Sequence, residues 1–184
     1  MIPVPTEATF RSGPPVPRSS LETFSGTVPA RAAALWGEHG LGQTAGGYLR
    51  IVDPAQWVDV LAEAAPRFAQ GVPLFSSALG DLFVWLGEHL HVLEFRSGTS
   101  RILTNSLDTF VVIAAYESFL EDPDYFDWAP WPEARDLVGV PEADECLGSV
   151  PLPALGGTRS AGSLQTVGMR EHILLIASLA GPLD

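Results

Sequence analysis

Two histidines separated by one residue, His89 and His91, are the side chains in this sequence that could most simply bind a metal. They lie in the stretch ALGDLFVWLGEHLHVLEF, which reads as two short β-prone runs split by Gly87-Glu88. On a strand, residues i and i+2 point to the same face, so both imidazoles would face one side. Asp81, across the hairpin, could supply a third ligand. One alternative is therefore a metal-dependent enzyme that uses His89, His91 and Asp81.

An ordinary sheet face with two histidines explains the same pattern. A lone His-x-His is common, and no second cluster of metal-type residues supports it. Asp81 follows Gly80 at the start of a strand, where we expect it to bond local backbone amides. The sequence therefore predicts no metal and no cofactor.

Other catalytic chemistry is excluded or disfavoured by the composition. The chain has no lysine, which excludes a phosphate-loop lysine and a Schiff base. Its single cysteine, Cys146, excludes an internal disulfide, and the adjacent Asp144 and Glu145 would raise the pKa of the thiol. The glycines of GLGQTAGG follow a helix and precede a strand, the reverse of the dinucleotide-binding order. We therefore predict a protein that is not an enzyme.

The acidic residues point to a different kind of site. The chain has 22 acidic and 10 basic residues, a net charge of −12, which repels nucleic acid and anionic membranes and attracts basic partners. Ten of the acids lie between residues 117 and 145, against a single Arg135 and among aromatic residues. One interpretation is a solvated acidic face whose aromatic rings turn into the core. The other is a protein-binding surface with aromatic anchors, for which the candidate contacts are Glu121, Asp122, Asp124, Tyr125, Asp127, Trp128, Trp131 and Glu133.

Helix signals are clearest in three segments. Thr27 as cap, Pro29 in the first turn and Gly40 at the end predict one helix. Asp53 as N-cap with Pro54 behind it predicts a second, and MREHILLIASLAG predicts a third at the end of the chain. The stretch SLDTFVVIAAYESFLED is predicted as a buried helix, whereas the proline-rich segment after it and ECLGSVPLPALGG are predicted as irregular.

Strands are predicted at GGYLRIV, in the two halves of the hairpin and at SRILTN. The fold class that follows is α+β: a curved, largely antiparallel sheet flanked by helices, with a mainly helical C-terminal part packed on it. The expected organisation is a flexible Pro-rich arm at 1–20, an α+β domain at 21–105 and a C-terminal domain at 106–184. The arm is expected to be dispensable for folding.

Several segments together resemble a known family. The order VPARAAALWGEHGLG, GYLRIVDP and SALGDLFVW resembles the GAD-like domain. ECLGSVPLPALGG followed by EHILLIASLAG is similar to the domain that ends bacterial type VI secretion immunity proteins of a DNase-immunity family. The resemblance implies a bacterial immunity protein that binds a cognate toxin, a secreted nuclease or similar effector with a basic surface, and it carries over no contact residue. The cytoplasmic location is expected separately, because the first residues do not resemble a secretory signal and no apolar run is long enough to span a membrane. A general protein-interaction module remains the other alternative.

Overall fold

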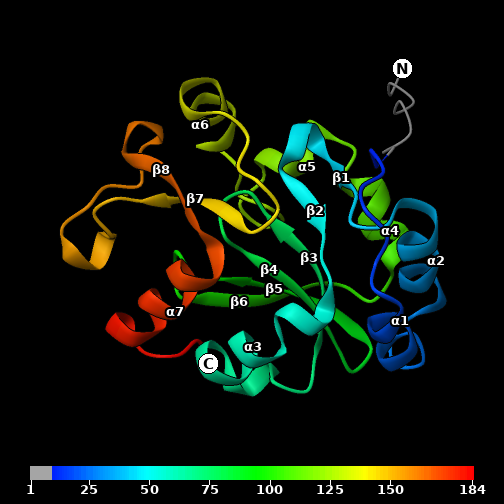
Figure 1. Ribbon diagram of the computed structural model, residues 1–184. Coiled ribbons are helices and arrows are strands. Elements are labelled where there is room, and N and C mark those ends of the chain that lie inside the picture. Colours follow the sequence, from blue (N-terminus) through cyan, green and yellow to red (C-terminus); the bar gives the residue numbers. More distant parts are fainter. Residues whose placement is uncertain (1–9) are drawn as a thin grey trace.

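A six-stranded antiparallel sheet forms the centre of the protein, of which the computed structural model describes residues 10–184. The strands follow one another across the sheet in chain order (Figure 1). Their bounds are β1 Gln43–Thr44, β2 Leu49–Ile51, β3 Val72–Ser77, β4 Leu82–Leu86, β5 His89–Glu94 and β6 Thr99–Thr104. The predicted antiparallel sheet and α+β class are confirmed.

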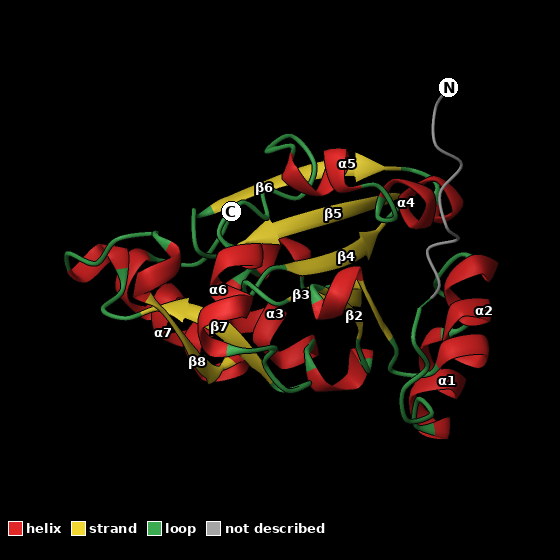
Figure 2. Cartoon of the chain, turned by 90° about the horizontal axis from the view of Figure 1, so that it is seen from above, coloured by secondary structure: helices red, strands yellow, loops and turns green. Residues whose placement is uncertain are grey.

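Helices and a second, smaller sheet surround this centre. The α-helices are α1 Arg18–Phe24, α2 Ala30–His39, α3 Val58–Ala64, α4 Leu107–Ile113, α5 Glu117–Glu121, α6 Trp131–Val138 and α7 Met169–Ala180. The small sheet pairs β7 Glu145–Ser149 with β8 Leu164–Gly168. Short 3-10 turns are η1 Ala45–Gly47, η2 Pro54–Gln56, η3 Pro66–Phe68, η4 Pro153–Leu155 and η5 Ala161–Ser163. Figure 2 shows α1 and α2 at one end of the central sheet and α7 with the small sheet at the other.

The β4–β5 hairpin is the predicted one. Leu86 pairs with His89, so the loop is the two residues between them, and Gly87 takes a positive φ of 64°. A two-residue loop with a left-handed glycine matches the twist of the flanking strands. Alternation along β4 then sends Phe83 to one face of the sheet and Leu82 to the other.

Each face of the sheet has its own hydrophobic cluster. The cluster that includes Phe83 is completed by residues of α2, α4 and α6, and the cluster that includes Leu82 by residues of α3 and α7. Figure 1 shows α3 and α7 on one side of the sheet, with α5 and α6 on the other. Because both faces are covered, all six residues of β3 are buried.

The start of the described chain is not a free arm, contrary to the sequence prediction. Phe10 and Val16 are 2% and 5% exposed. Arg11 forms a β-bridge with Gln43, and the amide of Gly13 donates to the carbonyl of His39 at 3.0 Å. Two buried apolar side chains and a paired backbone offset the ordering entropy of this segment. Residues 1–9 of the predicted arm lie outside the described residues.

The predicted helix boundaries are mostly confirmed. Gly40 ends α2 with a φ of 59°, but Pro29, not Thr27, occupies the N-cap position. Asp53 accepts a hydrogen bond from the amide of Ala55 at 3.2 Å, as expected of a cap, although the chain makes the turn η2 before α3 begins. Gly181 ends α7.

The C-terminal half contains the predicted helices and also elements that the sequence did not predict. The single helix expected from residue 106 is divided into α4 and α5, and α6 lies in the segment predicted as irregular. The stretch ECLGSVPLPALGG begins with β7, whose Leu147 donates its amide to the carbonyl of Ala78 at 2.7 Å. The sequence did not predict β7 because glycine and proline have low β propensity. The strand forms because of its tertiary contacts.

Candidate partner-binding surface

The eight predicted contact residues divide by exposure into three groups. The exposed group is Glu121, Asp124 and Glu133, the half-buried group is Asp122, Tyr125 and Asp127, and the buried group is Trp128 and Trp131. They are spread over α5, the following loop and α6. The carboxylates, rather than the indole rings, are therefore the groups that a partner could reach.

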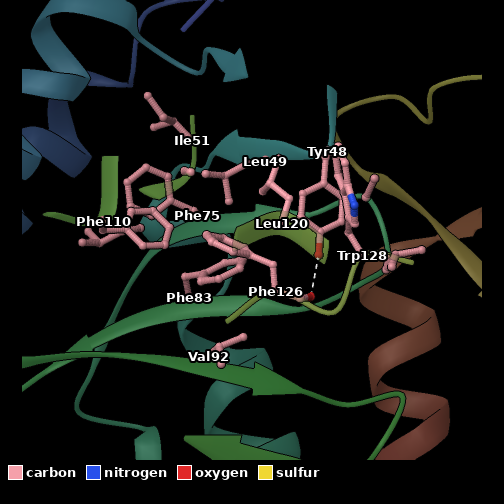
Figure 3. Close-up of a cluster of buried hydrophobic side chains, with 14 of the residues drawn as sticks. Tyr48, Leu49, Ile51, Phe75, Phe83, Val92, Phe110, Leu120, Phe126 and Trp128 are labelled. Carbon is pink, nitrogen blue, oxygen red and sulfur yellow. Dashed lines mark hydrogen bonds between the residues drawn. The ribbon is translucent and has the colours of Figure 1, made fainter. Parts of the chain in front are cut away.

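The two tryptophans belong to the core, so the prediction of exposed aromatic anchors is wrong for them. Trp128 meets the ring of Tyr48 edge-on at 5.6 Å between centroids, and Trp131 lies 6.0 Å from the same ring. The Tyr48 hydroxyl donates to the carbonyl of Phe126 at 2.9 Å, which fastens the loop beside β2 (Figure 3). The prolines near the tryptophans indicated a break in regular structure. They did not indicate whether the indole rings point into the core or into solvent.

Arg101, on β6, holds the acidic loop by its backbone. Its guanidinium donates to the carbonyl oxygens of Asp124 at 3.1 Å and Tyr125 at 2.8 Å, and it pairs with the buried Glu94 at 2.8 Å. Burial would raise the pKa of Glu94, but the hydrogen bonds and charge of Arg101 outweigh it and hold that pKa below its ordinary 4.5. Because Arg101 uses backbone oxygens, the exposed carboxylate of Asp124 is left for a partner.

Arg96, just after β5, also holds the acidic loop by a backbone carbonyl and binds a buried carboxylate. It donates to the Asp127 carbonyl at 2.9 Å and to Asp81 at 3.2 Å. The Ser77 hydroxyl donates to the other oxygen of Asp81 at 2.7 Å. Burial alone would lower the pKa of Arg96, but the neighbouring carboxylates, Asp81 foremost, raise it. The expected bonding of the Asp81 side chain to local amides is therefore wrong, since its partners are two side chains.

The histidine pair lies on one face of β5, as predicted, with ring centroids 6.5 Å apart. His91 packs edge-on against Phe68 at 5.3 Å, and burial, followed by the charge of His89, lowers the pKa of His91. Asp81 is already bonded to Arg96. Among residues 10–184, no group of three or more metal-type side chains is present. The metal-enzyme alternative thus finds no site in this part of the chain.

The environment of Cys146 is unfavourable for a nucleophile. Its side chain is fully buried in β7, and burial raises the pKa of the thiol to about 12. Arg50 opposes this rise, whereas Asp81 and Glu145 add to it. The predicted direction is right, but burial is the main cause and the acids are secondary.

Arg50, which the sequence analysis did not single out, fastens the other end of the acidic segment. It is 5% exposed, and it donates to the carbonyls of Glu142, Ser77 at 3.2 Å and Glu145 at 2.8 Å. The backbone between α6 and β7 is thereby held on β2. The sequence did contain a signal for this role: Arg50 lies between two apolar residues of a short predicted strand. A cation buried at such a position must bind hydrogen-bond acceptors.

Exposed apolar residues lie among the acids at the end of α6, and the sequence analysis missed them. Leu137, Val138 and Val140 are 62%, 44% and 45% exposed. Residues three and four apart share a helix face, which groups Leu137 with Glu133. We call this region the α6 surface, defined as Glu133, Asp136, Leu137, Val138, Val140 and Glu142. Exposed apolar side chains close in sequence to exposed carboxylates are groups that can bind another protein, although Asp136 already pairs with Arg135 at 3.1 Å.

The fold and the α6 surface define a class of protein: an α+β scaffold whose exposed chemistry suits binding to another protein. The chain belongs to the GAD-like domain family, whose model matches residues 6–97, half of the chain. A second model, described as T6SS immunity protein Tdi1, C-terminal, matches residues 104–180. Together the two matches describe a GAD-like domain protein that carries the C-terminal domain of type VI secretion immunity proteins. The first match begins before residue 21, so the ordered part of the expected arm lies within the GAD-like region.

A solved structure supports the fold. The crystal structure of Atu4351 from Agrobacterium tumefaciens aligns with a TM-score of 0.73 at 12% identity, covering 95% of this chain and 84% of that one. At this identity the likeness shows the fold alone. No curated protein matches the chain. Within the described residues, no helix has the length and apolar character to cross a membrane.

Proposed function

We propose that this protein binds and neutralises a cognate bacterial toxin, a secreted nuclease or similar effector, in the cytoplasm of the cell that it protects. The observation that carries the proposal is the match of residues 104–180 to the C-terminal model of a type VI secretion immunity protein. The α6 surface lies within that stretch. Protection then needs only binding, without catalysis, a metal or a cofactor.

Charge suggests how the partner is selected. A nuclease toxin carries a basic groove for nucleic acid. A chain with net charge −12 attracts such a groove and repels nucleic acid and anionic membranes. Carboxylates at the rim of the α6 surface speed the encounter, and its exposed leucine and valines bury apolar area on contact.

Rigid attachment of the acidic loops favours this mode of binding. Arg101, Arg96 and Arg50 hold the backbone of residues 124–145 on the central sheet at several points. A surface that is already ordered loses less conformational entropy when a partner binds. The three arginines are thus positioning residues for the α6 surface.

The test is a binding and protection experiment with the product of a toxin-like reading frame, sought first beside this chain's gene. A catalytically inactive toxin should form a one-to-one complex with the full chain, and co-expression should rescue cells from the active toxin. The association rate should fall as salt rises, because exposed charges are screened. A folded protein that neither binds the toxin nor protects the cells would overturn the proposal.

A further inference from the structure

A cavity of about 450 Å³ lies where the GAD-like region meets the C-terminal part of the chain. We call this part, from residue 104 onward, the C-terminal module. The GAD-like side contributes Leu79 and the β5–β6 turn with Phe95, and the C-terminal side contributes η4, β7, β8 and α7. Its walls combine apolar side chains, Leu152, Leu164 and Ile176 among them, with polar groups. The volume falls in the range of pockets that hold a ligand or an inserted side chain, roughly 300 to 1,000 Å³.

Two basic side chains of the C-terminal module line this cavity. Arg159 is exposed and has no ion-pair partner among residues 10–184. His172 is half-buried beside Gly148, where a larger residue would collide with its ring. Burial lowers the pKa of His172 and so favours the neutral imidazole, which can donate one hydrogen bond.

Two further charged residues line the cavity, Arg96 and Asp184. Arg96 also lines the cavity, but Asp81 and Asp127 already neutralise it. Asp184 also lines the cavity, and its backbone oxygen accepts a bond from the Ser100 hydroxyl of β6 at 3.5 Å. Among the described residues, Arg159 is therefore the arginine of the lining that has no ion pair, and it lies beside the apolar side chains of the cavity wall. A group that satisfies both features is an apolar side chain next to a carboxylate.

We propose that this junction cavity binds a protruding segment of the cognate toxin, which inserts an apolar side chain and presents a carboxylate to Arg159 and His172. The inference rests on the proposed function and adds a second contact to it. The partner is complementary to both regions: its basic surface meets the α6 surface, and its apolar–acidic segment enters the cavity. A neighbouring effector with a basic groove but without such a segment would bind loosely, so the cavity determines which toxin is neutralised.

The two contacts affect different rate constants. Long-range attraction by the α6 surface sets association, whereas a desolvated side chain in the cavity sets dissociation. Filling the cavity or removing its cation should therefore shorten the lifetime of the complex and leave its formation nearly unchanged.

The experiment measures both rate constants for the inactive form of the toxin identified by the binding and protection test, using the full chain. Arg159→Gln removes the cation, and Ala154→Trp places a large ring at an exposed residue of the cavity wall. The control is Arg67→Gln, another exposed arginine that has no ion pair in the described chain and does not line the cavity. Each cavity variant should dissociate about tenfold faster, which corresponds to loss of one charge-assisted hydrogen bond or one anchor. The control should match the wild type.

The outcomes separate this inference from the proposed function. If the wild type binds and both cavity variants, with unchanged melting temperatures, dissociate at its rate, the cavity inference is wrong and the immunity function stands. If the Arg67→Gln control dissociates as fast as Arg159→Gln, general charge explains the effect and the inference is again wrong. If the wild type does not bind the toxin, both proposals fall.

Discussion

Arg101 on β6 donates to the backbone carbonyl of Tyr125 at 2.8 Å, across 24 residues of sequence. The same guanidinium pairs with Glu94 on the neighbouring strand. One side chain therefore joins the last two strands of the central sheet to the loop that carries the acids. Because the bond uses a carbonyl, it orders the loop without consuming an exposed carboxylate.

Replacing Arg101 should destabilise the fold. Arg101→Gln leaves the buried carboxylate of Glu94 without its main partner, and breaking a buried ion pair costs about 3 to 5 kcal/mol. Arg101 is partly exposed and solvent screens the pair, so we expect a smaller loss than this range, about 2 kcal/mol, in urea unfolding. The double variant with Glu94→Gln should recover part of this loss, because the unpaired charge is then gone. Equal stability of Arg101→Gln and the wild type would contradict the role given to this ion pair.

Replacement of Trp131 and of Leu137 should affect the stability of the fold very differently. Trp131 is fully buried, so Trp131→Ala should cost about 3 to 5 kcal/mol of unfolding free energy. Leu137 is 62% exposed, so Leu137→Ala should change stability by less than about 0.5 kcal/mol. Thermal or urea unfolding of both variants measures the difference. A Trp131→Ala protein as stable as the wild type would restore the exposed-anchor interpretation of this ring.

Much of the central sheet could be predicted from the sequence. A two-residue loop between alternating runs fixes a hairpin, and Asp53 with Pro54 marks a helix start, because these signals act within a few residues. The C-terminal half was harder. The strand β7 contains Gly148 and precedes a proline-rich stretch, so its pairing depends on contacts with distant residues.

The candidate site was predicted in part for a similar reason. Composition locates the acidic segment, since charge is a property of the residues themselves. Burial of Trp128 and Trp131 depends on Tyr48, some 80 residues away, and no local pattern encodes that contact. The sequence did not mark Leu137 and Val140 as part of a binding surface, because a single exposed apolar residue is ordinary in a folded protein.

Acidification should weaken the fold through His172 and His91. Burial lowers the pKa of both below the ordinary 6.5, so the unfolded chain binds more protons than the folded one just below that pH. Their contribution is fully retained above pH 6.5 and is lost as the pH falls from there through the folded-state pKa values. Urea unfolding between about pH 7.5 and about pH 5.5 should show this loss, and the double variant His172→Gln/His91→Gln should show a smaller one. An identical slope for both proteins would mean that other groups control this range.

Neutralising the α6 surface should slow the encounter with the toxin while leaving the fold intact. Glu133, Asp136 and Glu142 are exposed, and exposed charges contribute little to stability. Changing all three to their amides should lower the association rate constant about tenfold at low salt and flatten its salt dependence, with little effect on dissociation. The measurement is stopped-flow or biosensor kinetics at two salt concentrations.

The matched control for this triple variant removes the same charge elsewhere. Glu22, Glu38 and Glu88 are exposed acids in the N-terminal half, outside the α6 surface. Their conversion to glutamine changes the net charge equally, so general attraction falls to a similar extent in both variants. A slower association for the α6 variant than for this control locates the encounter at α6. Charges within a Debye length of about 8 Å affect a local contact far more strongly than distant charges do. Equal association rates for the two variants would therefore show that net charge steers the toxin and that its docking face lies elsewhere.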